Sequence, residues 1–219
     1  RTVIRVPLSK PIPPGGEVRL ACDFTSKFPR VYARTGFTED DFYLIGQWFP
    51  KIGVWENGAW NCHQFHSNSE FYADFGVYTM ELTVPKKYVV GANAVLMEKK
   101  ALDDSTMYYR YRQEDVIDAV WTAYPEFKEF KQTVTIKETG RQVVVTYLVP
   151  PERTWVMPKY YETSDAMFNY YQEWYGAYPY PNLTIVDMPV GEEMTAGGME
   201  YPTLITTGSY FGWPFINKY

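Results

Sequence analysis

The segment around Gly197, Gly198 and Glu200 carries residue types with a definite chemistry. Two adjacent glycines have no Cβ atom, so their backbone N–H and C=O groups stay open to a ligand. An extended strand edge of this kind can pair with the main chain of a peptide. The Glu200 carboxylate can neutralise a ligand ammonium, a charge-assisted interaction worth roughly 1.5–3 kcal/mol. A glycine-rich turn beside a solvated glutamate explains the same residues, so the chemistry alone leaves both interpretations open.

The histidines offer a weaker candidate site. Cys62, His63 and His66 place one thiol and two imidazoles within five residues, but a zinc site needs four converging ligands, or three and a water. Neighbouring residues on a strand point to opposite faces, so Cys62 and His63 would not converge. We therefore predict a loop of polar residues here and no metal site. Cys22 and Cys62 can pair, but two cysteines far apart in sequence do not indicate a compartment.

Composition excludes several classes of protein. Of the 219 residues, 18% are aromatic, which a disordered chain would lack. The net charge is −5 and no basic run occurs, so we expect no nucleic-acid partner. No apolar run approaches the roughly 18–20 residues of a membrane-spanning helix. No Gly-x-Ser-x-Gly, P-loop or Gly-x-Gly-x-x-Gly motif occurs either.

Strand patterns run through most of residues 1–150. Met80, Leu82 and Val84 alternate with polar residues, which is the period of a half-buried strand. Residues 107–113 alternate aromatic and polar side chains in part. Short strands of this kind with Pro and Gly turns are typical of an antiparallel β domain.

Two hairpins are expected within this region. A Thr-Gly pair separates the β-branched runs 134–137 and 143–149, which predicts one hairpin. Residues 3–6 and 18–20 flank Pro-Ile-Pro-Pro-Gly-Gly, which predicts a second strand–turn–strand unit.

The pattern changes after residue 150 and predicts one helix that ends at Tyr175. Thr163 or Ser164 can cap its start, and Gly176 can terminate it. Extended segments over 183–188 and 199–206 follow the helix. One face of this helix, at i, i+3, i+4 and i+7 spacing, carries Met167, Tyr170, Tyr171 and Trp174.

Several ordered segments resemble zinc aminopeptidases of the aminopeptidase N type, in their bacterial branch. Residues 197–201, Gly-Gly-Met-Glu-Tyr, look like the family's Gly-x-Met-Glu-Asn exopeptidase motif, with Tyr in place of Asn. The helix ending in an aromatic residue and Gly, the Tyr-Pro-Tyr-Pro at 178–181 and the strand after it resemble the start of the family's thermolysin-like catalytic domain. Segments 46–53, 68–78 and 118–121 look like the family's N-terminal β domain.

The resemblance implies a mainly β fold with some α. Residues 1–157 would form an antiparallel β-sandwich-like domain that lacks its beginning. Residues 158–219 would form the first part of a thermolysin-like α/β catalytic domain.

The resemblance also assigns roles to single residues. It implies that Glu200 recognises the free α-amine of a peptide substrate and that Gly197 and Gly198 align the substrate main chain. Met199 would pack beneath them, and Gln47 would lie near the pocket for the first substrate residue.

Zinc is the cofactor that the resemblance implies, held by a His-Glu-x-x-His motif and a downstream Glu. His63 and His66 have the wrong spacing for this motif, so the ligands are expected outside this chain. We therefore expect the 219-residue chain to be inactive alone. The alternatives are a non-catalytic peptide-binding or scaffolding relative, and an independent carbohydrate- or protein-binding β-sandwich.

Overall fold

A five-stranded mixed sheet lies at the centre of the computed structural model, which describes residues 2–30, 34–66, 72–189 and 198–208. Its order is β10-β11-β12-β14-β13. β12 runs parallel to both β11 and β14, whereas the β10–β11 and β13–β14 pairs are antiparallel. The bounds are β10 Lys128–Thr135, β11 Gln142–Val149, β12 Asn182–Asp187, β13 Met199–Tyr201 and β14 Leu204–Thr207.

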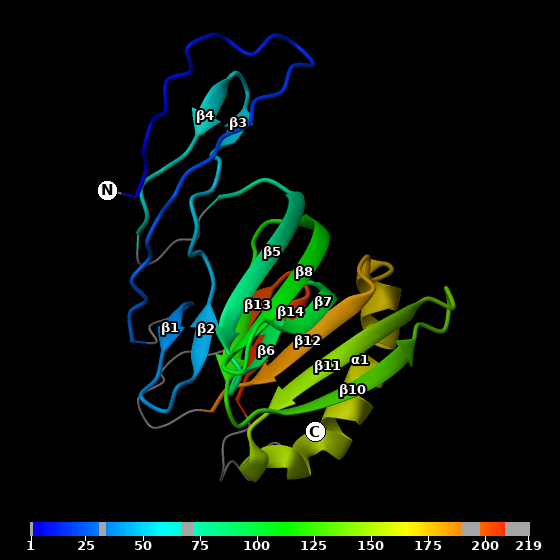
Figure 1. Ribbon diagram of the computed structural model, residues 1–219. Helices are drawn as coiled ribbons and strands as arrows, with labels where there is room; N and C mark the ends of the chain where they lie inside the picture. Colours follow the sequence, from blue (N-terminus) through cyan, green and yellow to red (C-terminus); the bar gives the residue numbers. More distant parts are fainter. Residues whose placement is uncertain (1, 31–33, 67–71, 190–197, 209–219) are drawn as a thin grey trace.

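Two antiparallel sheets and a small hairpin precede the mixed sheet in the chain (Figure 1). The four-stranded sheet consists of β1 Gly36–Phe37, β2 Tyr43–Ile45, β9 Trp121–Tyr124 and β6 Val89–Ala92, in that order. The three-stranded sheet consists of β5 Gly76–Pro85, β8 Thr106–Val116 and β7 Val95–Ala101. The hairpin is formed by β3 Val54–Glu56 and β4 Ala59–Asn61. A mainly β fold with one α-helix is thus confirmed among the described residues.

Three buried clusters hold these layers together. One lies between the mixed sheet and the helix α1 (Met157–Tyr175). The second lies between the mixed sheet and the four-stranded sheet, where an added Cβ at Gly91 would come within 2.4 Å of Leu148 Cδ1. The third joins the four-stranded and three-stranded sheets. The mixed sheet is therefore covered on both faces, by α1 on one side and by a second sheet on the other.

The predicted strand alternation is confirmed in β5 and β8. Met80 and Leu82 are buried, whereas the residues between and around them are exposed. The hairpin predicted over 134–149 is the β10–β11 pair, and Gly140 in its turn has φ +67°. A positive φ is readily adopted by glycine because it has no Cβ to clash. The mixed sheet combines strands from both sides of residue 157, and the domain division at that residue stays a prediction.

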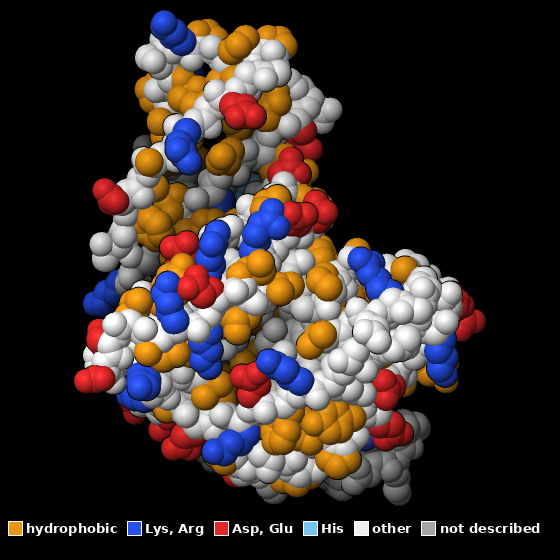
Figure 2. Space-filling model, turned by 45° about the vertical axis from the view of Figure 1, so that its right-hand side comes forward, with side chains coloured by type: hydrophobic (Ala, Val, Ile, Leu, Met, Phe, Trp, Pro, Cys, Tyr) orange, Lys and Arg blue, Asp and Glu red, His pale blue; other side chains and the backbone are white. Residues whose placement is uncertain are grey.

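The strand–turn–strand unit predicted over residues 3–20 is wrong. A turn does form, because the Gly16 N–H donates to the Pro13 carbonyl at 2.8 Å, but the flanking residues form no strand. Ile4 is 81% exposed and Val6 is 57% exposed. Figure 2 shows hydrophobic side chains on the projecting part of the molecule at the top of the view, where this segment lies beside β3 and β4 in Figure 1. The alternating apolar side chains of this segment have no sheet to pack against, and the segment pairs with no strand among the described residues.

The helix begins earlier than predicted. A 3₁₀-helix, η1 (Pro151–Val156), leads directly into α1 at Met157. Pro158 occupies its first turn, a position that proline tolerates because the N–H it lacks has no helical acceptor. The predicted caps at Thr163 and Ser164 are therefore wrong. The predicted end at Gly176 is confirmed, since its N–H donates to the Gln172 carbonyl at 3.0 Å.

The apolar face expected from the spacing does not lie against the mixed sheet. Tyr170, Tyr171 and Trp174 are exposed, and Met167 is only partly buried. The side facing the sheet carries polar contacts instead, because the Tyr147 hydroxyl donates to Gln132 Oε1 at 2.6 Å and is hydrogen-bonded to Ser164 Oγ at 2.8 Å. The spacing of apolar residues in a sequence does not indicate such polar contacts. The buried residues are Met157, Ser164, Phe168 and Gln172.

Leu148→Ala tests the packing between the two sheets. Leu148 is 0% exposed, so its truncation should lower the free energy of unfolding by about 2–5 kcal/mol through lost burial and a residual cavity. Val144 lies on the same strand and is 42% exposed, so Val144→Ala should cost less than about 1 kcal/mol. Equilibrium urea unfolding measures both. Equal losses would contradict the placement of Leu148 between the sheets.

Candidate functional site

The strand β13 lies at the edge of the mixed sheet. It pairs only with β14 among the described strands, in the register Met199↔Thr206, Glu200↔Ile205 and Tyr201↔Leu204. Backbone N–H and C=O groups on the outer side of an edge strand are available to another extended chain. Gly197 lies outside the described residues. Gly198, Met199 and Glu200 form or adjoin this edge.

Gly198 lies too close to the neighbouring strand for any other residue. A Cβ atom there would be 2.9 Å from the Thr206 carbonyl oxygen, a backbone atom that cannot turn aside. The next N–H, that of Met199, donates to Thr206 Oγ1 at 2.8 Å. The strand β13 is therefore held close to β14 at Gly198 and Met199.

The side chains of β13 alternate between the two faces of the sheet. Tyr201 is buried, and Met199 is partly buried, in the cluster between the two sheets. Glu200 points to the other face, opposite Ile205, and is exposed. The carboxylate is thus carried by a strand whose flanking side chains are fixed in the core.

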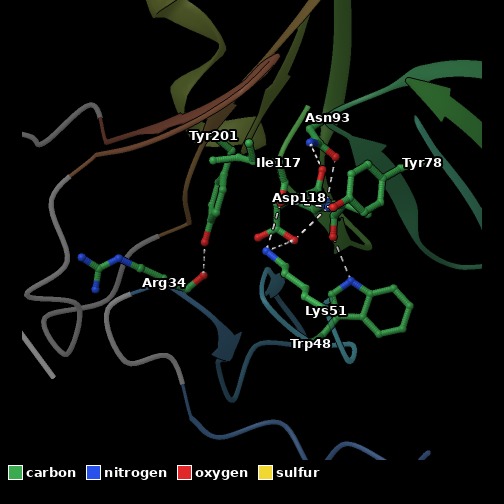
Figure 3. A network of polar contacts seen from close by, with 10 residues as sticks. Arg34, Trp48, Lys51, Tyr78, Asn93, Ile117, Asp118 and Tyr201 are labelled. Atoms are coloured by element: carbon green, nitrogen blue, oxygen red, sulfur yellow. Dashed lines mark hydrogen bonds and ion pairs between the residues drawn. The ribbon is translucent and has the colours of Figure 1, made fainter. Parts of the chain in front are cut away.

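Tyr201 connects β13 to a distant part of the chain. Its hydroxyl donates to the Arg34 carbonyl at 2.7 Å (Figure 3). A Cβ atom at Gly46 would lie 2.5 Å from the same hydroxyl oxygen, so the ring rests directly on the Gly46 backbone. Gln47, the predicted pocket residue, therefore follows a residue that touches β13.

A buried ion pair supports the segment that carries Gln47. Lys51 Nζ lies 3.0 Å from Asp118 Oδ1, with side chains 17% and 4% exposed. The backbone N–H groups of Ala119 and Gln47 also donate to the Asp118 carboxylate. Burial raises the pKa of Asp118 above its ordinary value, whereas Lys51 and the two N–H groups oppose that rise. Gln47 itself has φ +55°, a conformation that this anchoring sustains.

Further hydrogen bonds surround this ion pair (Figure 3). Trp48 Nε1 donates to the Ala119 carbonyl at 2.9 Å, and Lys51 Nζ donates to the Ile117 carbonyl at 3.2 Å. Asn93 Nδ2 donates to the Asp118 carbonyl at 2.8 Å. Residues 46–51 and 117–119 are therefore locked together beside the edge strand.

The structure brings some predicted residues together and leaves others apart. The Gly46–Gln47 segment meets β13, whereas Cys22, Cys62, His63 and His66 lie on exposed segments. Both cysteines are free. Within the described ranges, no group of three or more His, Cys, Asp or Glu side chains is placed to hold a metal ion. No helix in the part of the chain that the structure describes is long and apolar enough to span a bilayer.

Sequence reasoning did not find Arg34, Lys51 or Asp118 as parts of this region. The contact of Arg34 with Tyr201 uses its backbone carbonyl, which no side-chain pattern can indicate. Lys51 and Asp118 carry opposite charges, but nothing in their spacing marks them as a pair.

Comparisons with known proteins give a likeness in structure and none in sequence family. No family model matches the chain, and no curated protein matches it. The fold is similar to the crystal structure of Legionella pneumophila aminopeptidase A in complex with aspartic acid, with TM-score 0.51 and 18% identity. The match covers 61% of this chain and 16% of that chain. About three fifths of this chain therefore has a fold similar to a small part of that protein.

Gly46→Ala tests the contact between Gly46 and Tyr201. The Tyr201 ring is 6% exposed and cannot move aside freely, so the added methyl should cost about 1–3 kcal/mol of unfolding free energy. Gly76→Ala is the matched control, because the nearest atom to its added Cβ lies at 3.6 Å. Thermal and urea unfolding measure both variants. A loss at Gly76 as large as that at Gly46 would count against the contact.

Proposed function

We propose that the chain is part of a zinc-dependent aminopeptidase and supplies the segment that recognises the amino terminus of the substrate. The observation that carries this proposal is the exposed Glu200 on the edge strand β13. The fold similarity to an aminopeptidase supports it.

The edge strand β13 binds the main chain of the peptide, and the Glu200 carboxylate binds its amino terminus. An extended peptide pairs its main chain with the outer backbone groups of β13, as a further strand of the sheet. Glu200 then accepts hydrogen bonds from the α-ammonium group at the end of that peptide. A peptide with a blocked amino terminus lacks this charge, so the arrangement selects free amino termini.

The neighbouring residues keep this geometry constant. Gly198 lets the strand approach the Thr206 carbonyl, and Tyr201 holds the other end of β13 against Gly46. Gln47 follows Gly46 in the chain, and the proposal places its side chain near the first substrate residue. Preorganised groups bind a ligand without first being ordered, which lowers the cost of binding.

The proposed enzyme also needs ligands for its zinc ion. Within the described ranges no cluster of ligands is found, and the proposal assigns the ligands to residues outside this chain. The 219-residue chain is accordingly expected to bind free-amine peptides without hydrolysing them.

Glu200→Gln in the complete enzyme tests the amine-binding role. Loss of the carboxylate charge should lower kcat/KM for aminoacyl p-nitroanilides by about one to two orders of magnitude, equivalent to roughly 1.5–3 kcal/mol. Glu162→Gln is the matched control, because Glu162 is an exposed glutamate on α1 with a side chain 72% exposed, and it should leave kcat/KM unchanged.

Two results would contradict the proposal. Unchanged kinetics in Glu200→Gln would remove its amine-binding role. A complete protein that binds free-amine peptides but shows no zinc-dependent turnover would instead be a non-catalytic, peptide-binding relative.

A further inference from the structure

A groove lies at the opposite edge of the mixed sheet from β13. It runs between the end of β10, the turn after it and the helix α1, and its volume is about 740 Å³. Because β10 and β13 are the two outer strands of the sheet, the groove is separate from the proposed peptide site. Its lining residues are Thr135, Lys137, Glu138, Asp165, Ala166, Asn169, Tyr170, Gln172 and Glu173.

The groove is acidic and holds a buried acceptor without a partner. Glu138, Asp165 and Glu173 line it together with one cation, Lys137. Gln172 is only 7% exposed, and its Nε2 donates to Glu138 Oε2 at 2.8 Å. A carboxylate only accepts hydrogen bonds, so this contact fixes the orientation of the amide. The Gln172 Oε1 atom is left buried with no hydrogen-bond partner, which is costly unless a ligand supplies a donor.

A row of exposed aromatic rings continues from this groove along α1. Tyr170 lines the groove and stacks on Trp174 with ring centroids 6.0 Å apart. Trp174 in turn contacts Tyr171 at 6.1 Å and Tyr175 at 6.3 Å. The four rings are between 51% and 80% exposed. Contiguous exposed aromatic surface of this kind is typical of a binding surface.

We propose that this groove and the aromatic row bind an arginine-bearing segment of another polypeptide. The guanidinium group supplies several donors in one plane, which suits Glu138, Asp165 and the free oxygen of Gln172. The same planar cation stacks on an aromatic face such as that of Tyr170. Apolar residues beside the arginine cover Trp174 and Tyr175. The net charge of −5 favours a basic partner over a second copy of this chain.

A blocked peptide tests the proposal on the 219-residue chain. The probe is acetyl-Leu-Arg-Leu-Arg-Leu amide, whose acetylated end has no ammonium group for Glu200. The comparison peptide carries citrulline in place of arginine, which keeps the shape and removes the charge. Isothermal titration calorimetry should show binding of the arginine peptide and at least about tenfold weaker binding of the citrulline peptide. Added salt should weaken binding of the arginine peptide, because it screens the attraction between opposite charges.

Variants of the chain locate the binding surface. Glu138→Gln combined with Asp165→Asn should lower the affinity for the arginine peptide by at least about tenfold. Trp174→Ala should lower that affinity by a similar factor. Trp155→Ala is the matched control, since Trp155 and Trp174 are both 62% exposed and Trp155 does not line the groove. Circular dichroism and thermal unfolding confirm that each variant is folded.

Three results would overturn the proposal. Equal binding of the arginine and citrulline peptides would exclude recognition of the cation, whatever the variants do. Binding that persists in the acidic and Trp174 variants would place the site elsewhere. A concentration-dependent dimer that Trp174→Ala abolishes in analytical ultracentrifugation would assign the surface to a second copy. None of these results bears on Glu200, so the proposed function is tested separately.

Discussion

The contact between the Tyr201 ring and the Gly46 backbone is the constraint on which the candidate site depends. It joins the edge strand β13 to the segment that contains Gly46, and the Tyr201 hydroxyl also donates a hydrogen bond to the Arg34 carbonyl. Because Tyr201 is buried, Glu200 before it must point to the opposite face of β13. The contact therefore determines where the carboxylate lies and which segment borders it.

The mixed sheet supports two separate surfaces because its parallel centre is covered on both faces. β12 lies between β11 and β14, and the antiparallel strands β10 and β13 form the edges. A buried ion pair helps to hold this centre, since Arg153 Nη1 lies 3.0 Å from Asp187 Oδ1 and also donates to the Met188 carbonyl at 2.8 Å. The Tyr160 hydroxyl donates to the other carboxylate oxygen at 3.0 Å. η1 and α1 are thereby tied to the end of β12.

Patterns in the sequence predict those strands, turns and helix ends that depend on residues close to one another in the chain. The alternation around Met80 and Leu82, the β10–β11 hairpin with its turn glycine and the helix end at Gly176 all depend on near neighbours. The segment over residues 3–20 has the same alternation, but its apolar side chains meet no facing sheet and remain exposed. At the start of α1 lies Pro158, and on its buried side Ser164 is hydrogen-bonded to Tyr147; hydrophobic periodicity indicates neither feature. Of the site, the motif at 198–200 is visible in the sequence, whereas the Gly46–Tyr201 contact joins residues too distant for any spacing to indicate.

Hydrogen–deuterium exchange of the 219-residue chain with a small peptide tests the central claim most directly. The probe is Ala-Ala-Ala amide with a free amino terminus, compared with its acetylated form. Pairing with the edge strand predicts slower exchange of backbone amides in β13 with the free-amine peptide, and no slowing with the acetylated peptide or in Glu200→Gln. Unchanged exchange in β13, or equal slowing by both peptides, would contradict the assignment of this strand and its glutamate to amino-terminal recognition.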